Sequence, residues 1–354
     1  MEVLQEVLAA YGLTDETLKV ESFGTGLINN TWKANTTNNM FILQKVNEYV
    51  FKKPTDIAYN VNLLAAYLQQ THPAYIFIAP IAALNGNTFI YIKGQGYFRM
   101  FPFVAHSITH EVVQTKEQAF EAASQFGRFT KLLCGFDCSK LRFTIPDFHN
   151  LTLRYQQFLI SLQQGNQQRI KEADVLIKQL KSYSFIAETY KRIIVDASFK
   201  QRVTHHDTKI SNVLFDANDK GLCVIDLDTV MSGYFISDVG DIMRTYLSPV
   251  NEEETDFSKI EVRHEIYKAI VKGYLSEMQN ELSESEKNHF FFAGQFMIYM
   301  QAIRFLTDYF NDDVYYGSKY AGHNLSRAMN QTVLLERFMG QKNIFESFTS
   351  HLLN

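Results

Sequence analysis

The chain has 354 residues, of which 46% are hydrophobic and 20% charged, values that exclude a disordered or fibrous protein. This length exceeds what one compact core usually holds and favours two lobes. Acidic residues outnumber basic ones by 38 to 34, so the composition gives no general attraction to nucleic acid or anionic membranes. Cys134, Cys138 and Cys223 form neither a disulfide framework nor a zinc-finger spacing, which is typical of a reduced, cytoplasmic protein.

Short strands separated by turns fill most of the first hundred residues. The opening segment, residues 1–13, predicts an amphipathic helix rather than a signal peptide, because Glu2 and Glu6 interrupt its apolar positions. Five apolar or aromatic runs then alternate with Gly- and Asn-rich turn signals, at residues 19–23, 30–34, 40–46, 88–92 and 97–103. Apolar side chains at helical spacing predict one helix among them, over residues 55–70. We expect residues 1–103 to form an N-lobe, a small antiparallel sheet with one helix.

Helical patterns dominate the rest of the chain. Two capping boxes, Thr115–Gln118 and Ser283–Glu286, mark helix starts, and we expect the second to open the apolar helix at residues 290–306. That helix carries polar residues and is too short for a membrane span, so it predicts a buried core helix. We predict an α+β protein with a larger, mainly helical C-lobe over residues 104–354 and a junction near Pro102–Val104.

The most informative stretch reads VTHHDTKISNVLFD and is followed by GLCVIDLDTV. It places His205, Asp207 and Asn212 in an H-x-D-x-x-x-x-N arrangement, with Asp226 after an apolar strand fourteen residues beyond Asn212. Phosphoryl transfer needs a carboxylate that orients the attacking hydroxyl and accepts its proton, and oxygen ligands that hold magnesium on the phosphates. Asp and Asn are also common in surface turns. The full spacing, the two framing strands and the second acidic motif together favour the chemical interpretation.

These motifs resemble the aminoglycoside phosphotransferase and choline kinase branch of the protein-kinase-like fold. Within that branch, further segments between residues 20 and 316 resemble bacterial N-acetylhexosamine 1-kinases: GTGLINNTWKA, FILQKVNEYVFKKP, YFRMFPFV, HHDTKISNVLFD, VIDLDTVMSG and SDVGDIMRT. The resemblance implies a two-lobed protein-kinase-like fold with a nucleotide-binding N-lobe, and ATP and Mg²⁺ as cosubstrate and cofactor. It also implies phosphorylation of the anomeric hydroxyl of N-acetylglucosamine or N-acetylgalactosamine.

The resemblance gives each residue of the catalytic segment a role. Asp207 is the expected catalytic base and would also contact the substrate. Lys209 is expected to neutralise charge on the transferring phosphoryl group, with an exposed loop lysine as the plain alternative. The expected metal ligands are Asn212, Asp226 and Asp228.

A glycine loop joins two strands of the expected sheet. Glycines allow the backbone to approach a ligand closely, and consecutive N–H groups can hold phosphate. The residues expected to bind nucleotide are Gly24, Thr25, Gly26 and Asn30 of this loop, with Phe103 from the expected lobe junction. A plain β-turn is the alternative for the loop.

Two features depart from the family pattern. Leu27 stands where many related enzymes carry a histidine. The lysine that kinases place at the end of the third strand falls on Gln44, with Lys45 beside it, and strand alternation puts these neighbours on opposite faces. The expected helix over residues 55–70 has no glutamate, so the usual lysine–glutamate ion pair is missing.

The end of the apolar helix predicts the acceptor site. Arg304 lies among apolar neighbours and needs a partner, which Asp308, four residues on, could supply. The segment that follows provides aromatic side chains that suit a sugar ring. The resemblance points to Arg304 and Tyr315 as substrate ligands, with Tyr316 as the alternate.

Other hypotheses stay open on sequence alone. A kinase for another small hydroxyl substrate, such as choline, homoserine or an aminoglycoside, would use the same motifs. A catalytically inactive nucleotide-binding module would explain the missing third-strand lysine, but binding alone needs no base and metal ligands such as Asp207, Asn212 and Asp226. We expect a cytoplasmic, monomeric enzyme whose partners are ATP and a small-molecule sugar, not nucleic acid or a membrane.

Overall fold

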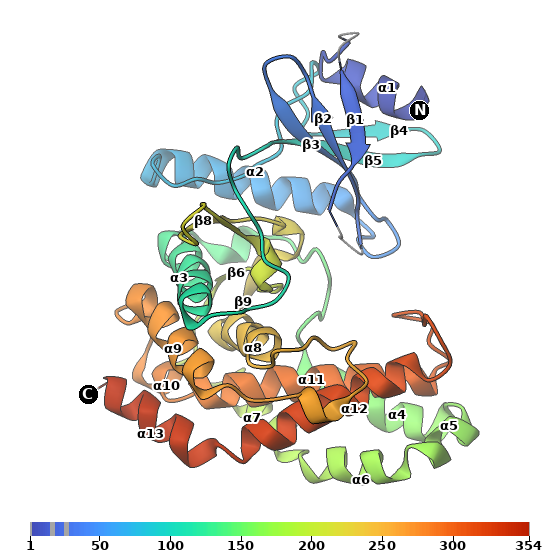
Figure 1. Cartoon of the computed structure of the whole chain (residues 1–354), viewed down its shortest axis with the longest axis vertical. Coiled ribbons are helices and arrows are strands. Elements are labelled where there is room, and N and C mark those ends of the chain that lie inside the picture. The colour runs from blue at the N-terminus through green and yellow to red at the C-terminus, as the bar shows by residue number, and fades with distance from the viewer. Residues whose placement is uncertain (1, 15–17, 25–27, 354) are drawn as a thin grey trace.

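The computed structural model describes residues 2–14, 18–24 and 28–353. A small β-sheet lies at one end of the molecule, and a larger body of helices forms the rest (Figure 1). The helix α2 (Pro54–Thr71) lies between the two parts. In the part of the chain that is described, no helix combines the length and the apolar character needed to cross a membrane.

The sheet is antiparallel and has the strand order β1-β2-β3-β5-β4. Its strands are β1 (Lys19–Ser22), β2 (Asn30–Asn35), β3 (Met40–Lys45), β4 (Phe89–Ile92) and β5 (Gly96–Pro102). These are the five runs expected from sequence, shifted by a residue or two at the ends. One face of the sheet packs against α1 (Glu2–Ala10) through a small apolar cluster of Val7, Leu8, Ala34, Leu43, Phe98 and Met100. The other face is left to form one wall of a cleft.

The helix α2 has its apolar side in the core of the helical body. Ile57, Val61 and Leu64 are buried in the large cluster that runs through that body, separate from the cluster between the sheet and α1. Asn60, fully buried, donates from Nδ2 to the carbonyls of Arg142 (2.8 Å) and Val230 (3.0 Å) and accepts from the Arg142 amide (2.9 Å). The α2 helix is therefore bonded to the helical body, although it lies between two strands of the sheet in sequence.

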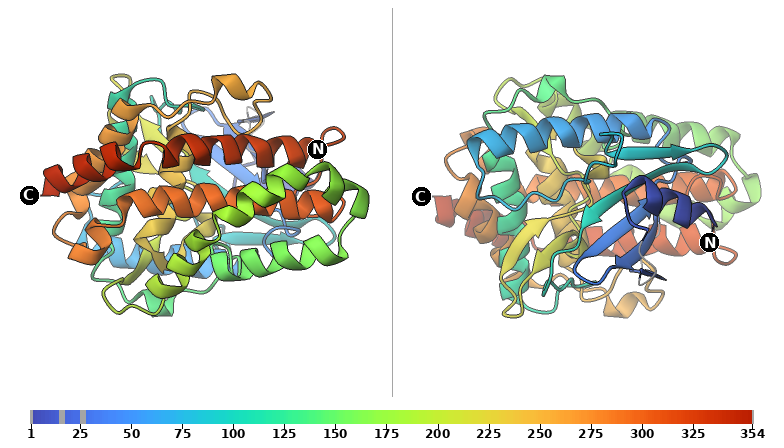
Figure 2. Two further views of the ribbon diagram at one scale, coloured as in Figure 1. Left: turned by 90° about the horizontal axis from the view of Figure 1, so that it is seen from below. Right: turned by 90° about the horizontal axis from the view of Figure 1, so that it is seen from above.

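The helical body holds the other helices and two small antiparallel strand pairs, β6–β9 and β7–β8. Its helices are α3 (Lys116–Leu132), α4 (Leu151–Gln164), α5 (Gln167–Glu172), α6 (Asp174–Ser182), α7 (Phe185–Ile193), α8 (Phe235–Tyr246), α9 (His264–Met278), α10 (Glu284–Lys287), α11 (Phe290–Phe310), α12 (His323–Met339) and α13 (Lys342–Leu353). Its strands are β6 (Gln201–Thr204), β7 (Val213–Phe215), β8 (Gly221–Val224) and β9 (Met231–Tyr234). Figure 2 shows α11 and α12 running side by side on the face away from the sheet.

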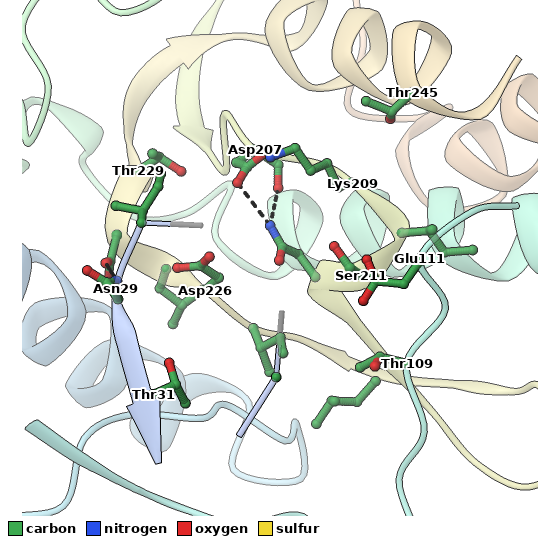
Figure 3. A pocket seen from close by; sticks show the side chains of 18 of the residues that line it. Asn29, Thr31, Thr109, Glu111, Asp207, Lys209, Ser211, Asp226, Thr229 and Thr245 are labelled. Carbon is green, nitrogen blue, oxygen red and sulfur yellow. Dashed lines mark hydrogen bonds and ion pairs between the residues drawn. The ribbon is translucent and has the colours of Figure 1, made fainter. Parts of the chain in front are cut away.

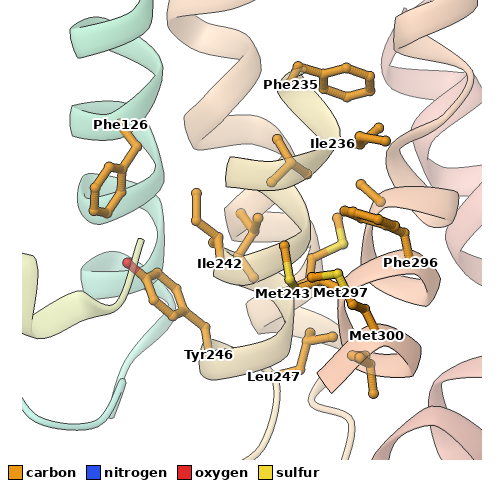
Figure 4. Close-up of a cluster of buried hydrophobic side chains, with 14 of the residues drawn as sticks. Phe126, Phe235, Ile236, Ile242, Met243, Tyr246, Leu247, Phe296, Met297 and Met300 are labelled. Carbon is orange, nitrogen blue, oxygen red and sulfur yellow. The ribbon is translucent and has the colours of Figure 1, made fainter. Parts of the chain in front are cut away.

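The apolar helix α11 forms the centre of this body, as expected for a core helix. Side chains of α8 meet it in a cluster that includes Met243, Phe296 and Met297 (Figure 4). The two helices cross closely at Gly240, where an added Cβ would lie 2.4 Å from the carbonyl oxygen of Ala293. Glycine is required there because any larger residue would push the two helices apart.

The region before residue 104 contains two helices, α1 and α2, and the sequence patterns predicted both. The structure corrects one detail of the sequence analysis. The capping box Ser283–Glu286 is present but opens the short α10, and α11 begins at Phe290. The first capping box, Thr115–Gln118, is confirmed at the start of α3.

Candidate active site

A cavity of about 560 Å³ lies between the sheet and the helical body. Residues of the sheet line one side of it, and the segments after β6 and β8 line the other. Figure 3 shows Asp207, Lys209 and Asp226 around one space, with Asn29 and Thr31 approaching from the start of β2. The cavity brings together residues that are far apart in sequence.

Two aspartates of α8 hold the loop that carries Asp207. The carboxylate of Asp238 accepts from the backbone amides of His205 (2.9 Å) and His206 (2.7 Å). Asp241 accepts from the amide of Thr208 at 2.8 Å. These bonds satisfy buried backbone donors in a segment that has no strand partner, so the loop is held in one conformation.

Asp207 is placed as a carboxylate with two polar neighbours. Lys209 Nζ lies 3.2 Å from Oδ1, and Asn212 Nδ2 donates to Oδ2 at 3.2 Å. Burial acts to raise the pKa of Asp207, but the charges of Lys209, His205 and Arg244 and the hydrogen bond from Lys209 together outweigh it and lower the pKa below its ordinary value. The charge of Asp207 raises the pKa of Lys209 in turn. Asp207 is therefore ionised at neutral pH, the state in which a carboxylate can accept a proton.

The hairpin of β7 and β8 brings Asp226 beside Asn212. The amide of Ile225 donates to the carbonyl of Asn212 at 2.9 Å, and Asp226 follows in a left-handed conformation with φ 60°. Burial, with the charges of Asp228 and Asp207, raises the pKa of Asp226 to about 7. A raised carboxyl pKa marks negative charge without enough compensation, which a bound cation would supply.

The donor set suits magnesium shared with a phosphate ligand. Among the described residues, no three or more His, Cys, Asp or Glu side chains form a group that could hold a metal ion. Magnesium is commonly held by one or two protein groups plus substrate phosphates, and Asn212 and Asp226 provide one amide and one carboxylate. Asp228, the third expected ligand, has both oxygens engaged, by Arg99 and by Asn29 Nδ2 at 2.8 Å.

The expected nucleotide-binding residues are only partly placed together. Gly24, with φ 77°, and Phe103 line the cavity, whereas Thr25, Gly26 and the departure at Leu27 lie outside the described residues. Asn29 and Thr31 also line the cavity. Asn30, between them, is exposed, because successive residues of a strand point to opposite faces.

The third strand presents Gln44 to the cavity and Lys45 to the other side. Gln44 lines the cavity, whereas the Lys45 ammonium lies 5.8 Å from the centre of the Phe98 ring, which belongs to the cluster between the sheet and α1. Arg99 of β5, which was not among the predicted site residues, bonds to Gln44. The alternation in YFRMFPF could have identified Arg99 as a residue near the site, because it places Arg99 on the same face as Phe101 and Phe103.

Arg304 and Tyr315 line a second cavity of about 340 Å³. Arg304 Nη1 donates to Gln301 Oε1 at 3.3 Å, and Nη2 donates to the Tyr315 hydroxyl at 3.4 Å. Asp308 instead accepts from the amides of Tyr315 (2.7 Å) and Tyr316 (2.9 Å). In the part of the chain that the structure describes, both hydrogen-bond partners of Arg304 are thus neutral.

A row of rings connects this second cavity to the catalytic loop. The Arg304 guanidinium lies 5.4 Å from the centre of the Phe148 ring, which stacks on His149 with centroids 4.4 Å apart. His149 Nδ1 is 3.2 Å from Nδ1 of His206, the residue before Asp207. The two cavities have no lining residue in common. Arg304 is therefore connected through this row to the residue before Asp207, and it lines a different cavity.

Comparisons with known proteins match this arrangement. A sequence profile of the phosphotransferase enzyme family matches residues 19–262. The fold is similar to a microcompartment-associated aminopropanol kinase, at 17% identity and a TM-score of 0.65, over 96% of this chain and 98% of that one. It is also similar to a spectinomycin phosphotransferase in complex with ADP and spectinomycin, at 14% identity and a TM-score of 0.62, over 96% and 98% of the two chains. A choline kinase from Cryptosporidium parvum aligns at 12% identity and a TM-score of 0.57, over 99% of each chain. The two-lobed kinase-like fold is thereby confirmed.

Proposed function

This chain belongs to the phosphotransferase enzyme family, and from that premise we propose that it is an ATP-dependent kinase for N-acetylhexosamine. The transferred group would be the γ-phosphoryl of ATP, and the acceptor would be the anomeric hydroxyl of N-acetylglucosamine or N-acetylgalactosamine. The observation that carries a kinase function is the ionised Asp207 between Lys209 and Asn212, in one cavity with Asp226.

Asp207 acts as the base in this proposal. Its carboxylate accepts a hydrogen bond from the acceptor hydroxyl, orients that oxygen toward the phosphoryl group and takes the proton as the new bond forms. Lys209, bonded to the same carboxylate, brings a positive charge to the place where negative charge gathers on the phosphoryl oxygens. Magnesium, which Asn212 and Asp226 would hold, neutralises charge on the phosphates when bound.

The second cavity supports a neutral acceptor such as a sugar. Arg304 is buried, and two of its five N–H groups donate to described partners, both neutral, so the remaining N–H groups are available to the oxygens of a sugar or acetamide group. Tyr315 and Tyr316 offer ring faces next to it, with the guanidinium 5.7 and 5.5 Å from their centres. A sugar bound there would have to bring its hydroxyl to Asp207, which lines the other cavity.

The alternative is a kinase for a cationic acceptor such as choline, an amino alcohol or an aminoglycoside. The glutamates Glu252 and Glu253 line the first cavity and favour this alternative at first sight. Burial acts to raise the pKa of Glu252, but ion pairs with Arg244 and Arg327 lower it to about 2. The negative charge of Glu252 is already balanced by these two arginines, which argues against binding of a cationic acceptor beside it.

A phosphorylation screen tests the proposal. The purified protein with ATP and Mg²⁺ is given the two N-acetylhexosamines, choline, homoserine, aminopropanol and an aminoglycoside, with Asp207→Asn as the inactive control. We expect turnover with an N-acetylhexosamine and a ³¹P spectrum of a sugar 1-phosphate. Turnover with a cationic acceptor alone, or a phosphate on another sugar carbon, would reject the sugar 1-kinase assignment.

A further inference from the structure

The strand that usually supplies the phosphate-binding lysine of a kinase presents no cation to the nucleotide cavity here. Gln44 occupies the cavity face of β3, and Lys45 faces the cluster between the sheet and α1. The helix α2 carries no glutamate that could pair with such a lysine. The usual lysine–glutamate pair, which must be in place for phosphoryl transfer in protein kinases, is therefore missing on both sides.

Arg99 provides a cation at this place from the neighbouring strand. It is the register partner of Gln44 on β5, and only 2% of its surface is exposed. Its Nε and Nη2 donate to Gln44 Oε1 at 3.1 and 2.8 Å, and Nη1 donates to the carboxylate of Asp228. Register partners lie on the same face of a sheet, so Arg99 stands directly beside the residue that lines the cavity.

The ion pair joins the sheet to the segment that carries Asp226. Asp228 is buried two residues after Asp226, and its second oxygen accepts from Asn29 Nδ2 at 2.8 Å. Asp228 is thus held by two residues of the sheet side, Arg99 and Asn29. Because a buried carboxylate without a partner is costly, this pair strongly favours one position of the Asp226 segment against the sheet.

The Arg99 bonds also set the orientation of the Gln44 amide. Arg99 occupies the carbonyl oxygen, so the amide nitrogen is turned the other way and donates to Thr31 Oγ1 at 3.2 Å. An amide nitrogen has two hydrogens, and one remains for a ligand. A neutral amide with an arginine behind it can then donate to a phosphate oxygen in the place of a lysine.

We propose that Arg99 is a positioning residue for the phosphates of the nucleotide, acting through Gln44 and Asp228 in place of the missing lysine–glutamate pair. This inference rests on the proposed kinase function but not on the identity of the acceptor. Its ligand is the diphosphate part of a nucleotide.

The test measures ADP affinity by isothermal titration calorimetry, together with the melting temperature. Arg99→Met removes the cation, Arg99→Lys keeps the charge without the bond geometry, and Arg99→Met combined with Gln44→Lys returns a lysine to the third strand. Arg99→Met combined with Asp228→Asn removes both charges and serves if Arg99→Met alone is unstable. The matched control is Arg142→Met, because Arg142 pairs with Asp56 of α2 at 2.8 Å outside the cavity.

We expect Arg99→Met to raise the ADP dissociation constant at least about tenfold, the size typical of losing a charge-assisted hydrogen bond. Arg99→Lys should fall between it and the wild type, Gln44→Lys should restore affinity to within about threefold, and Arg142→Met should change it less than about twofold. Wild-type affinity in Arg99→Met and in its double with Asp228→Asn would overturn the proposal. An equal loss in Arg142→Met, or no rescue by Gln44→Lys, would overturn it as well.

ADP binding separates this inference from the proposed function. The measurement needs no acceptor, so a wrong sugar assignment leaves it valid. A wild-type protein that binds no ADP would instead reject the kinase function itself.

Discussion

Replacing Arg304 with alanine should weaken use of the acceptor while leaving nucleotide chemistry intact. The hydrogen bonds of Arg304 to Gln301 and Tyr315 are long, at 3.3 and 3.4 Å, and both partners are neutral. Their loss, with loss of contact to neighbouring rings, should cost about 1–2 kcal/mol of unfolding free energy. One or two charge-assisted hydrogen bonds to a sugar are worth about 1.5–3 kcal/mol. Catalytic efficiency for N-acetylhexosamine should therefore fall by about one to two orders of magnitude.

Three measurements on one preparation decide the role of Arg304: melting temperature, sugar-dependent turnover and sugar-independent ATP hydrolysis. The slow hydrolysis of ATP should survive, because it needs only the Asp207 cavity. Arg169→Ala is the matched control, since Arg169 pairs with Asp313 at 2.7 Å and donates to the Tyr309 carbonyl at 2.7 Å. That control should lower the melting temperature without a selective loss of sugar turnover. Parallel loss of all three quantities in Arg304→Ala would refute a role in substrate binding.

Three other predictions concern the base, a buried histidine and a close helix crossing. Asp207→Asn should keep the melting temperature and lower turnover by about 10²- to 10⁴-fold, and turnover within a factor of two of wild type would contradict the assignment. Burial lowers the pKa of His206 to about 3, below its ordinary 6.5, so the neutral ring is favoured in the folded state. The contribution of neutral His206 to the free energy of unfolding is therefore complete above pH 6.5. It is lost as the pH falls toward 3, by about 1.4 kcal/mol per pH unit. Because burial also lowers the pKa of His149 and of His205, the test compares two proteins: in urea unfolding between pH 6.5 and 5, the stability of His206→Asn should fall by about 1.4 kcal/mol less per pH unit than that of the wild type. Asparagine tolerates the φ of 67°, and an equal slope in both proteins would contradict the prediction. Gly240→Ala should cost about 2–3 kcal/mol because its Cβ would meet Ala293 at 2.4 Å, whereas Gly340→Ala, with its nearest contact at 3.5 Å, should unfold at nearly the wild-type urea concentration. Equal stability of the two alanine variants would show that the crossing can relax.

Local patterns predicted most of the elements because their causes are local. Alternating apolar residues and turn signals placed the five strands of the sheet, and the first capping box placed the start of α3. The second capping box, at Ser283, gave a wrong start for α11, because a short helix and a turn precede α11. A capping box does not indicate how long its helix is.

The residues of the candidate site likewise fall into two groups, those that local sequence patterns predicted and those whose place depends on tertiary packing. The spacing from Asp207 to Asn212, and the strand before Asp226, predicted the residues that share the first cavity. The pairing of Arg99 with Asp228 could not be inferred from the sequence, because Asp228 is 129 positions away and only the packed lobes bring the two together. The connection of Arg304 to the catalytic loop also depends on tertiary packing, through a row of rings that no motif marks.

The hydrogen bonds of Asn60 determine which parts of the molecule can move against each other. They attach α2 to the segments at Arg142 and Val230, and the buried side of α2 belongs to the core of the helical body. A cleft that opens to release nucleotide would then part the sheet and α1 from everything else, with α2 staying behind. Three stretches of chain cross that boundary, at residues 46–53, 72–88 and from 103 onward. Because three stretches of chain connect the two parts in place of a single linker, we expect the sheet to rock over α2 rather than to swing away as an independent domain.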